Sequence, residues 1–230
     1  MINKEFIDRF FPKGKLSIVA ARPATGLTSF AISIARSLVN NGENLLYRSL
    51  EMPERTLLDR ILAQEKCENL MNEKMFHISD DFNTWSFDTL KYRMEENNCK
   101  TLIVDYLQLL NLEREEKYVS RSSALRHVLE QLSQYARLSQ YRIIVLSMFH
   151  RLSMEKTMHP DMEVFSQLWG TCPEDYNYYS LVSTDNSAAK DNRSIVFVSV
   201  TSDKPNLEIG LSMDKNTGKF SSQQSKQSEQ

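Results

Sequence analysis

The stretch from Lys15 to Leu38 constrains the fold more than any other, because it has the pattern of a strand, a tight loop and a helix. Leu16–Val19 is a short apolar run, as in a buried strand. The loop covers Arg22–Gly26, and a helix is predicted from Thr28 because apolar residues then recur at helical spacing, at Phe30, Ile34 and Leu38. A strand, loop and helix in this order direct backbone N–H groups and the positive end of the helix dipole to one spot, which suits a phosphate group.

The loop matches a known phosphate-binding pattern only in part. The pattern G-x-x-x-x-G-K-[ST] falls on residues 21–28. Gly26 and Thr28 occupy the positions of the second glycine and the hydroxyl, whereas Ala21 and Leu27 replace the first glycine and the lysine. Spacing alone therefore leaves two interpretations open. The stretch is either an ordinary strand-loop-helix unit or a nucleotide site that has lost its charged residue.

The rest of the chain alternates apolar runs with amphipathic helices. Runs at 44–50, 76–78, 100–110 and 142–147 are predicted strands, and helices are predicted near 57–62, 86–97 and 121–138. This alternation predicts an α/β fold, with a mostly parallel sheet flanked by helices. Four runs are expected in one sheet: Leu16–Val19, Leu45–Tyr47, Leu102–Asp105 and Ile143–Leu146. A β-rich C-terminal part follows, with strands at Tyr179–Ser183, Ser194–Thr201 and Leu207–Met213.

Three segments are predicted along the chain. Residues 1–14 form an N-terminal arm whose apolar side chains dock on the body of the domain or on a neighbouring subunit, and these side chains are Phe6, Ile7, Phe10 and Phe11. Residues 15–220 form the main domain, in which residues 151–161 are a polar loop. Residues 221–230 contain no apolar side chain and are expected to be a disordered tail.

Two carboxylates follow predicted strands at the same edge of the sheet as the loop. In parallel sheets ligands bind at the carboxyl ends of the strands, so Glu51, Asp105 and Ser147 are expected near the loop. An acid directly after Leu102–Val104 suits a magnesium ion, held directly or through water. Glu51 is placed to orient an attacking water. Each acid alone is more often a helix cap or a solvated loop residue. The loop and both acids in this order along the chain are stronger evidence for a nucleotide site than any one of them.

The composition limits which partners the protein can bind and in which cellular compartment it is expected. The net charge of −2 gives no global basic field, so contacts with nucleic acid have to come from local patches. The three cysteines are scattered at Cys67, Cys99 and Cys172, which favours reduced thiols in a cytoplasmic protein over disulfides or a zinc site. No apolar run is long enough to span a membrane, so no membrane partner is expected.

Four blocks of sequence resemble the C-terminal RecA-like motor domain of DnaB-type replicative helicases. The blocks are Ile18–Thr28 (IVAARPATGLT), Ser49–Met52 (SLEM), Ile103–Leu110 (IVDYLQLL) and Ile144–Arg151 (IVLSMFHR). The likeness continues through Leu168–Gly170 to Ser212–Asp214 and Phe220, so it covers roughly residues 14–220. It implies a RecA-like P-loop NTPase fold with a β-rich C-terminal part.

The resemblance also implies roles for individual residues. ATP would lie on the loop and the start of the helix, on Arg22, Pro23, Ala24, Thr25, Gly26, Leu27, Thr28 and Ser29. Thr28 and Asp105 would hold Mg²⁺ through the nucleotide, and Glu51 would be the catalytic glutamate. Leu27 stands where the family has its phosphate-binding lysine, and Met148 stands where a glutamine senses the γ-phosphate. Near the family's Lys-x-Arg finger this chain has only Lys204. These replacements predict an impaired nucleotide site.

Two function classes follow. The first is a DnaB-like ATPase or DNA helicase subunit in DNA replication, with single-stranded DNA, replication proteins and further copies of itself as partners. The second is a non-catalytic RecA-like module for binding or regulation. The family works as a hexamer, but weak nucleotide contacts predict a monomer or weak oligomer here. The loop after Ser147 decides little, since it mixes bases with acids: Arg151, Lys156, His159, Asp161 and Glu163.

Overall fold

The computed structural model describes residues 2–64, 75–80, 85–112, 118–149, 161–184, 192–200 and 207–222. The helices are α1 (Lys4–Phe10), α2 (Leu27–Asn40), α3 (Glu54–Ala63), α4 (Phe87–Glu96), α5 (Arg121–Ser139) and α6 (Met162–Trp169), with a 3₁₀ turn at Leu107–Leu109. The strands are β1 (Leu16–Ala21), β2 (Leu45–Ser49), β3 (Phe76–Ser79), β4 (Thr101–Asp105), β5 (Arg142–Met148), β6 (Asn177–Ser183), β7 (Asn192–Val200), β8 (Leu207–Asp214) and β9 (Phe220–Ser222).

All of these strands belong to one sheet, in the order β3-β2-β4-β5-β1-β6-β7-β8-β9. The pairs from β3 to β6 are parallel, and the pairs from β6 to β9 are antiparallel. The four apolar runs expected in one sheet lie in β1, β2, β4 and β5, which occupy adjacent places in it. The predicted α/β class, the mostly parallel sheet and the β-rich C-terminal part are therefore confirmed.

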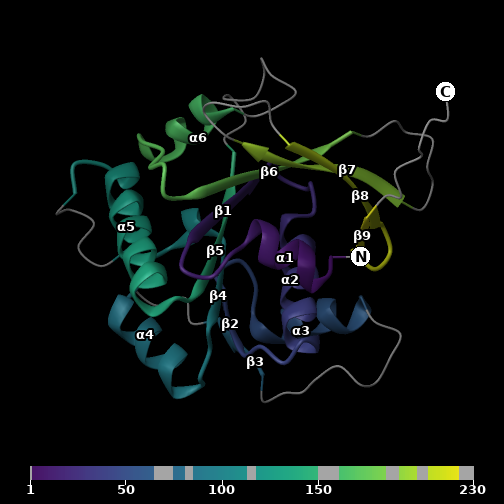
Figure 1. The fold of residues 1–230 in the computed structure, drawn as a ribbon, viewed down its shortest axis with the longest axis horizontal. Coiled ribbons are helices and arrows are strands. Elements are labelled where there is room, and N and C mark those ends of the chain that lie inside the picture. Colours follow the sequence, from purple (N-terminus) through teal and green to yellow (C-terminus); the bar gives the residue numbers. More distant parts are fainter. Residues whose placement is uncertain are drawn as a thin grey trace.

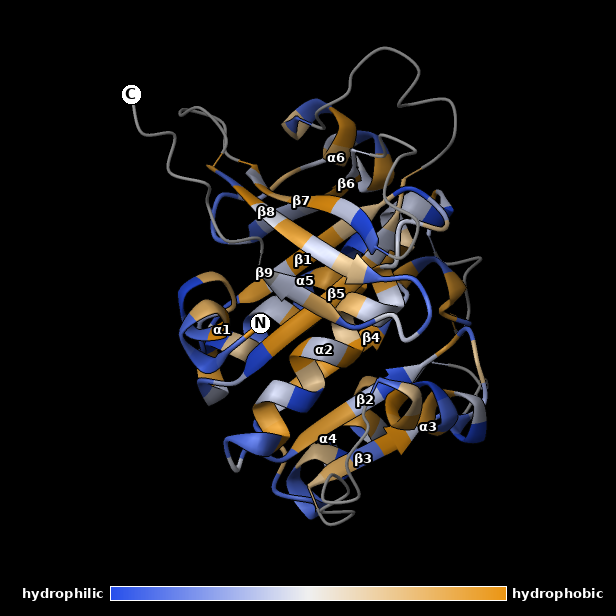
Figure 2. Ribbon diagram, turned by 90° about the vertical axis from the view of Figure 1, so that its right-hand side faces the viewer, coloured by the Kyte–Doolittle hydropathy of each residue, from blue (hydrophilic) through white to orange (hydrophobic). Residues whose placement is uncertain are grey.

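Helices cover both faces of the sheet. Figure 1 shows α4 and α5 on one side of the strands and α1, α2 and α3 on the other. Each side has its own hydrophobic cluster: α4, α5 and α6 contribute to the first, and α1, α2 and α3 to the second. The central strands are hydrophobic along most of their length, whereas the turns at the periphery are hydrophilic (Figure 2). A parallel sheet needs this cover on both faces.

The N-terminal arm docks on the body through α1. Phe10 and Phe11 pack with Tyr179 and Phe197 in the second cluster, with ring centroids 5.1–6.1 Å apart. The guanidinium of Arg142, which is 1% exposed, donates to the carbonyl of Phe11, to Asp8 at 2.6 Å and to Glu43 at 3.1 Å. Of the two docking sites left open by the sequence, the structure shows the body of the domain.

Several boundaries differ from the predictions. The stretch expected as β-rich begins with a helix, α6, which Asp161 caps by accepting from the backbone N–H of Val164. The run 100–110 is a strand only to Asp105 and then turns. Ser221 and Ser222, which were expected in the disordered tail 221–230, pair with β8 instead, and residues 223–230 lie outside the described residues. The polar loop, apart from Asp161, and Lys204 lie outside the described residues.

Two further expectations concern cysteines and membranes. Cys99 and Cys172 are free thiols, and Cys67 lies outside the described residues. None of the described helices combines the length and the apolar character that a membrane crossing requires.

Candidate functional site

The loop after β1 is the centre of the candidate site. Its backbone enters the left-handed region twice, at Ala24 (φ 64°) and at Gly26 (φ 100°). Gly26 is the N-cap of α2, and no side chain caps this helix end. The first N–H groups of a helix need partners from outside the helix. An uncapped helix start after a tight loop is therefore suited to an anion, as the sequence predicts.

Gly26, the last residue of the loop, lies against side chains of the C-terminal strands. A Cβ atom built on Gly26 would lie 2.6 Å from the Sδ atom of Met213 on β8, so a larger residue does not fit without movement. Replacing Gly26 with alanine should lower the free energy of unfolding by about 1–3 kcal/mol, through strain at positive φ and the clash together. Urea unfolding measures this loss.

Gly42→Ala is the matched control for this prediction. Gly42 also has a positive φ of 78°, but a Cβ atom there would meet nothing within 4 Å. The control therefore carries the backbone strain without the clash, and should cost about 1 kcal/mol. Equal losses for the two variants would show that Met213 does not restrict the loop.

Leu27, which stands where the phosphate-binding pattern has a lysine, points into the protein. Its side chain is only 8% exposed and belongs to the second hydrophobic cluster, with Phe30 and Ala31 of the same helix. Burial of an apolar side chain at this position stabilises the fold. A lysine here would have to extend its ammonium group out of the hydrophobic cluster to reach water or a ligand. The loop consequently presents backbone groups, but no charge from Leu27, to a ligand.

Asp105 is the last residue of β4 and is 1% exposed. The buried hydroxyl of Tyr47 donates to its Oδ2 atom at 2.7 Å. Burial is the main cause that raises the pKa of Asp105 to about 6, while hydrogen bonds from Tyr47 and Thr28 lower it. The negative charge of Glu51 raises this pKa further, and Arg60 opposes the rise. Thr28 is therefore in hydrogen-bond contact with this carboxylate, and the charges of Glu51 and Arg60 act on it.

The ends of β2 and β4 are joined at this rim. Ser49 and Asp105 are register partners, and the N–H of Leu50 donates to the carbonyl of Asp105 at 2.7 Å. The next residue, Glu51, is exposed to solvent. Glu51 therefore stands at the mouth of the site while Asp105 lies inside it, at the edge of the sheet where the sequence predicts both acids.

The buried residues fit a divalent cation that arrives with a nucleotide. Within the described part of the chain, the Oδ1 atom of Asp105 is buried and has no hydrogen-bond partner. A buried carboxylate oxygen without a partner is costly, and a cation or water would satisfy it. Among these same residues no group of three or more His, Cys, Asp or Glu side chains could hold a metal ion. Mg²⁺ would thus need phosphate oxygens to complete its shell.

Three neighbours of the site have no place in the sequence prediction. Tyr47 orients Asp105, as described above. The amide of Gln108 binds the end of β5, since its Nε2 donates to Ser147 and to the carbonyl of Met148, and its Oε1 accepts from the N–H of Met148. Arg193 of β7 donates to the carbonyl of Ala24. The apolar run of β2 signalled Tyr47 only as core, and Gln108 stood in the Ile103–Leu110 block without a role of its own. Nothing local signalled Arg193.

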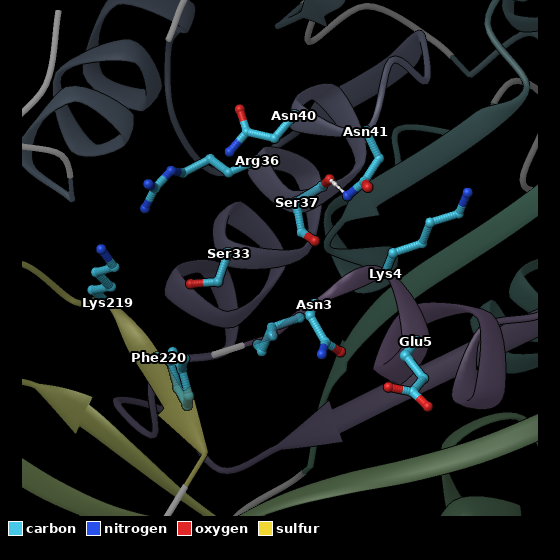
Figure 3. Close-up of a pocket in the computed structure, with 11 residues that line it drawn as sticks. Asn3, Lys4, Glu5, Ser33, Arg36, Ser37, Asn40, Asn41, Lys219 and Phe220 are labelled. Carbon is cyan, nitrogen blue, oxygen red and sulfur yellow. Dashed lines mark hydrogen bonds between the residues drawn. The ribbon is translucent and has the colours of Figure 1, made fainter. Parts of the chain in front are cut away.

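A polar groove elsewhere on the surface is separate from this site. It has a volume of about 590 Å³ and lies between α1, α2 and β9, with Lys4, Arg36 and Lys219 among its lining residues. Figure 3 shows that Lys4 points away from Arg36 and Lys219, so the three cations do not converge on one point. None of the loop residues 22–29 and neither of the two acids lines it.

Comparison with known proteins gives matches in sequence. A profile of the family described as DnaB-like helicase C terminal domain matches residues 7–86. The replicative DNA helicase DnaB of Mycoplasma pneumoniae is 26% identical over 175 residues, which are 63% of this chain and 37% of that protein. Across the curated helicases compared, this chain spans between 36% and 53% of their length.

Solved structures give matches in fold. A DnaB-like replicative helicase, described with its interactions with primase, has a TM-score of 0.76 at 19% identity and covers 96% of this chain and 62% of that chain. A KaiC-like protein from Pyrococcus horikoshii has a TM-score of 0.65 at 18% identity, with 94% of each chain covered. The fold of this chain is that of these RecA-like domains.

Proposed function

Since this chain is a DnaB-type C-terminal RecA-like domain, we propose that it serves DNA replication, binds MgATP weakly and hydrolyses it slowly. One observation carries the proposal. Thr28, at the start of the helix after the loop, interacts with the buried Asp105, while Leu27, at the position of the pattern's lysine, is buried in the core, and this supports a nucleotide site without its lysine. The site thus retains its cradle and loses a cation.

Each retained group has a part in this proposal. The N–H groups at the start of α2 bind phosphate oxygens, and Thr28 and Asp105 hold Mg²⁺. Glu51, exposed at the rim, orients a water molecule. Magnesium, when bound with the nucleotide, neutralises phosphate charge. The remaining loop residues, from Arg22 to Ser29, enclose the phosphates.

The missing cation sets the expected strength of binding. A hydrogen bond to a charged group contributes about 1.5–3 kcal/mol, so its loss weakens triphosphate binding by roughly ten- to a hundredfold. Hydrolysis depends more strongly on positive charge, because charge develops on the transferred phosphoryl group. Slow turnover follows from the replacement of the lysine, and the methionine at position 148 adds to it.

A second candidate is a non-catalytic RecA-like module that binds or regulates other replication proteins. The burial of Leu27 favours it, because an apolar contact now stabilises the loop without a ligand. Proposed partners under either candidate are single-stranded DNA, further copies of the chain and replication proteins such as a primase. Weak nucleotide contacts favour a monomer or weak oligomer over a stable hexamer.

Calorimetric titration with ATP, with and without Mg²⁺, tests the proposal. The chain should bind MgATP measurably, and Asp105→Asn should weaken the magnesium-dependent binding by about tenfold or more. Asp88→Asn, on the exposed start of α4, is the control and should leave binding unchanged. Turnover should stay well below about 1 per second with single-stranded DNA.

The other outcomes decide between the candidates. Turnover of a few per second, stimulated by single-stranded DNA, would identify a working motor and refute the proposal of slow hydrolysis. No binding of MgATP at any accessible concentration would refute the nucleotide site and favour the non-catalytic module. Equal binding by the chain and its Asp105→Asn variant would remove Asp105 from the proposed magnesium site.

A further inference from the structure

Arg193 touches the phosphate loop from a distant part of the chain. It lies near the start of β7, is partly buried, and its Nη1 atom donates to the carbonyl of Ala24. Ala24 is the loop residue with a left-handed φ of 64°. A guanidinium is therefore fixed at the backbone of the loop whose lysine is missing.

The antiparallel strands hold Arg193 in this place. Arg193 and Met213 are cross-strand partners in the pairing of β7 with β8. Met213 in turn lies against Gly26, at the other end of the loop. Both contacts with the loop come from one pair of neighbouring strands. The register of these strands therefore fixes the backbone of Arg193 beside the loop, and the hydrogen bond with Ala24 fixes its guanidinium. A charge held in advance loses less entropy when a ligand binds.

Two other arginines are near the candidate site. Arg22 belongs to the loop itself and is exposed. Arg60 of α3 is exposed as well, and its charge acts on the acid side of the site, where it opposes the rise in the pKa of Asp105. Arg193 differs from both, because its hydrogen bond with the loop backbone ties it to the phosphate side.

We propose that Arg193 supplies, within the same chain, the positive charge that Leu27 does not give to the nucleotide phosphates. An arginine presents five N–H donors in a planar fork, so one guanidinium can hold a loop carbonyl and a phosphate oxygen together. This inference rests on the proposed nucleotide site and adds a residue that selects for phosphate-bearing ligands over the bare nucleoside.

The test compares Arg193→Gln with the unaltered chain in titrations with MgATP, MgADP and adenosine. Glutamine is two bonds shorter than arginine at this end, so the substitution removes the charge and also the contact of Nη1 with the carbonyl of Ala24. Binding of MgATP should weaken by about tenfold, as for the loss of a charge-assisted hydrogen bond. Adenosine binding should not change, and the melting temperature without ligand should stay within about 2 °C.

Three further variants sharpen the test. Arg193→Lys keeps the charge but not the planar fork, so it should recover only part of the affinity for MgATP that Arg193→Gln loses. Arg126→Gln removes a positive charge from α5, away from the loop, and should leave all three titrations unchanged. In a Leu27→Lys background the effect of Arg193→Gln should fall below about threefold, because the two cations serve the same phosphates.

The failures of the two proposals are distinguishable. Undetectable MgATP binding by the unaltered chain would refute the nucleotide site and this inference with it. Measurable binding that Arg193→Gln leaves unchanged would overturn only the role of Arg193. Equal losses for MgATP and adenosine would show that Arg193 merely shapes the loop. A larger loss for Arg60→Gln than for Arg193→Gln would assign the charge to Arg60 instead.

Discussion

Replacement of Arg142 with alanine is expected to lower the free energy of unfolding by about 3–5 kcal/mol. The side chain is 1% exposed and joins three parts of the molecule: the carbonyl of Phe11, Asp8 and Glu43. Its removal leaves the buried carbonyl of Phe11 without this donor and leaves the partly buried Glu43 with only Lys13 and Thr101, which costs more than the pair itself gains. Urea unfolding followed by circular dichroism measures the loss.

Arg126→Ala is the control for this prediction. Arg126 forms a partly exposed ion pair with Glu130 at 4.0 Å, so its loss should cost less than about 1 kcal/mol. A loss below about 1 kcal/mol for Arg142→Ala too would contradict the role given to the buried guanidinium.

The effect of Arg142→Ala should also depend on pH. Burial alone would raise the pKa of Glu43, but the charge of Arg142, followed by Lys13, outweighs it, so the pKa lies below its usual value. A lowered pKa in the folded state stabilises the protein above the unfolded pKa, and this stability is lost as pH falls through the folded value. The difference between the two proteins should therefore shrink below about pH 4.

Leu27→Lys should strengthen binding of MgATP by about ten- to a hundredfold, since it returns a charged donor to the loop. The gain has a cost in stability, because Leu27 is 8% exposed and packs in the second cluster. Loss of that packing should lower the free energy of unfolding by about 1–3 kcal/mol. Titration calorimetry and urea unfolding of the same preparation separate the two effects.

Leu27→Gln is the matched control, because it removes the packing without adding a charge. It should share the loss of stability and show no tenfold gain in affinity. Turnover should rise only slightly in Leu27→Lys, since position 148 is still methionine. A folded Leu27→Lys protein without any gain in affinity would contradict the idea that the missing lysine weakens this site.

Sequence patterns predicted the parallel half of the fold well, for a physical reason. Strands covered on both faces are apolar throughout, and β1, β2, β4 and β5 stand out for this reason. The sequence prediction does not include the helix α6, although Asp161 is a typical residue at a helix start and Gly170 is a typical residue at a helix end. Its three buried residues, Val164, Phe165 and Trp169, fall in a stretch predicted to be β-rich.

The candidate site also has a part that local sequence patterns predict and a part that they do not. The loop and the two acids follow from local sequence patterns, and in the structure a hydrogen bond from Thr28 and the charge of Glu51 both act on Asp105. Contacts set by long-range pairing were not predictable. Arg193 reaches Ala24 only because β7 joins the sheet through β6, and Gln108 reaches Met148 only because β4 and β5 are neighbours. No pattern within a window of sequence encodes these registers.

The docking of α1 also bears on how much of the chain makes one cooperative folding unit. A chain that begins at residue 15 would keep every described strand of the sheet, so the sheet alone would not show that anything is missing. It would nevertheless uncover the rings of Tyr179 and Phe197 and take the Phe11 carbonyl away from Arg142. Such a shortened domain would expose an aromatic patch of the kind that drives aggregation. The folding unit therefore includes α1, although the loop of the candidate site begins only after β1.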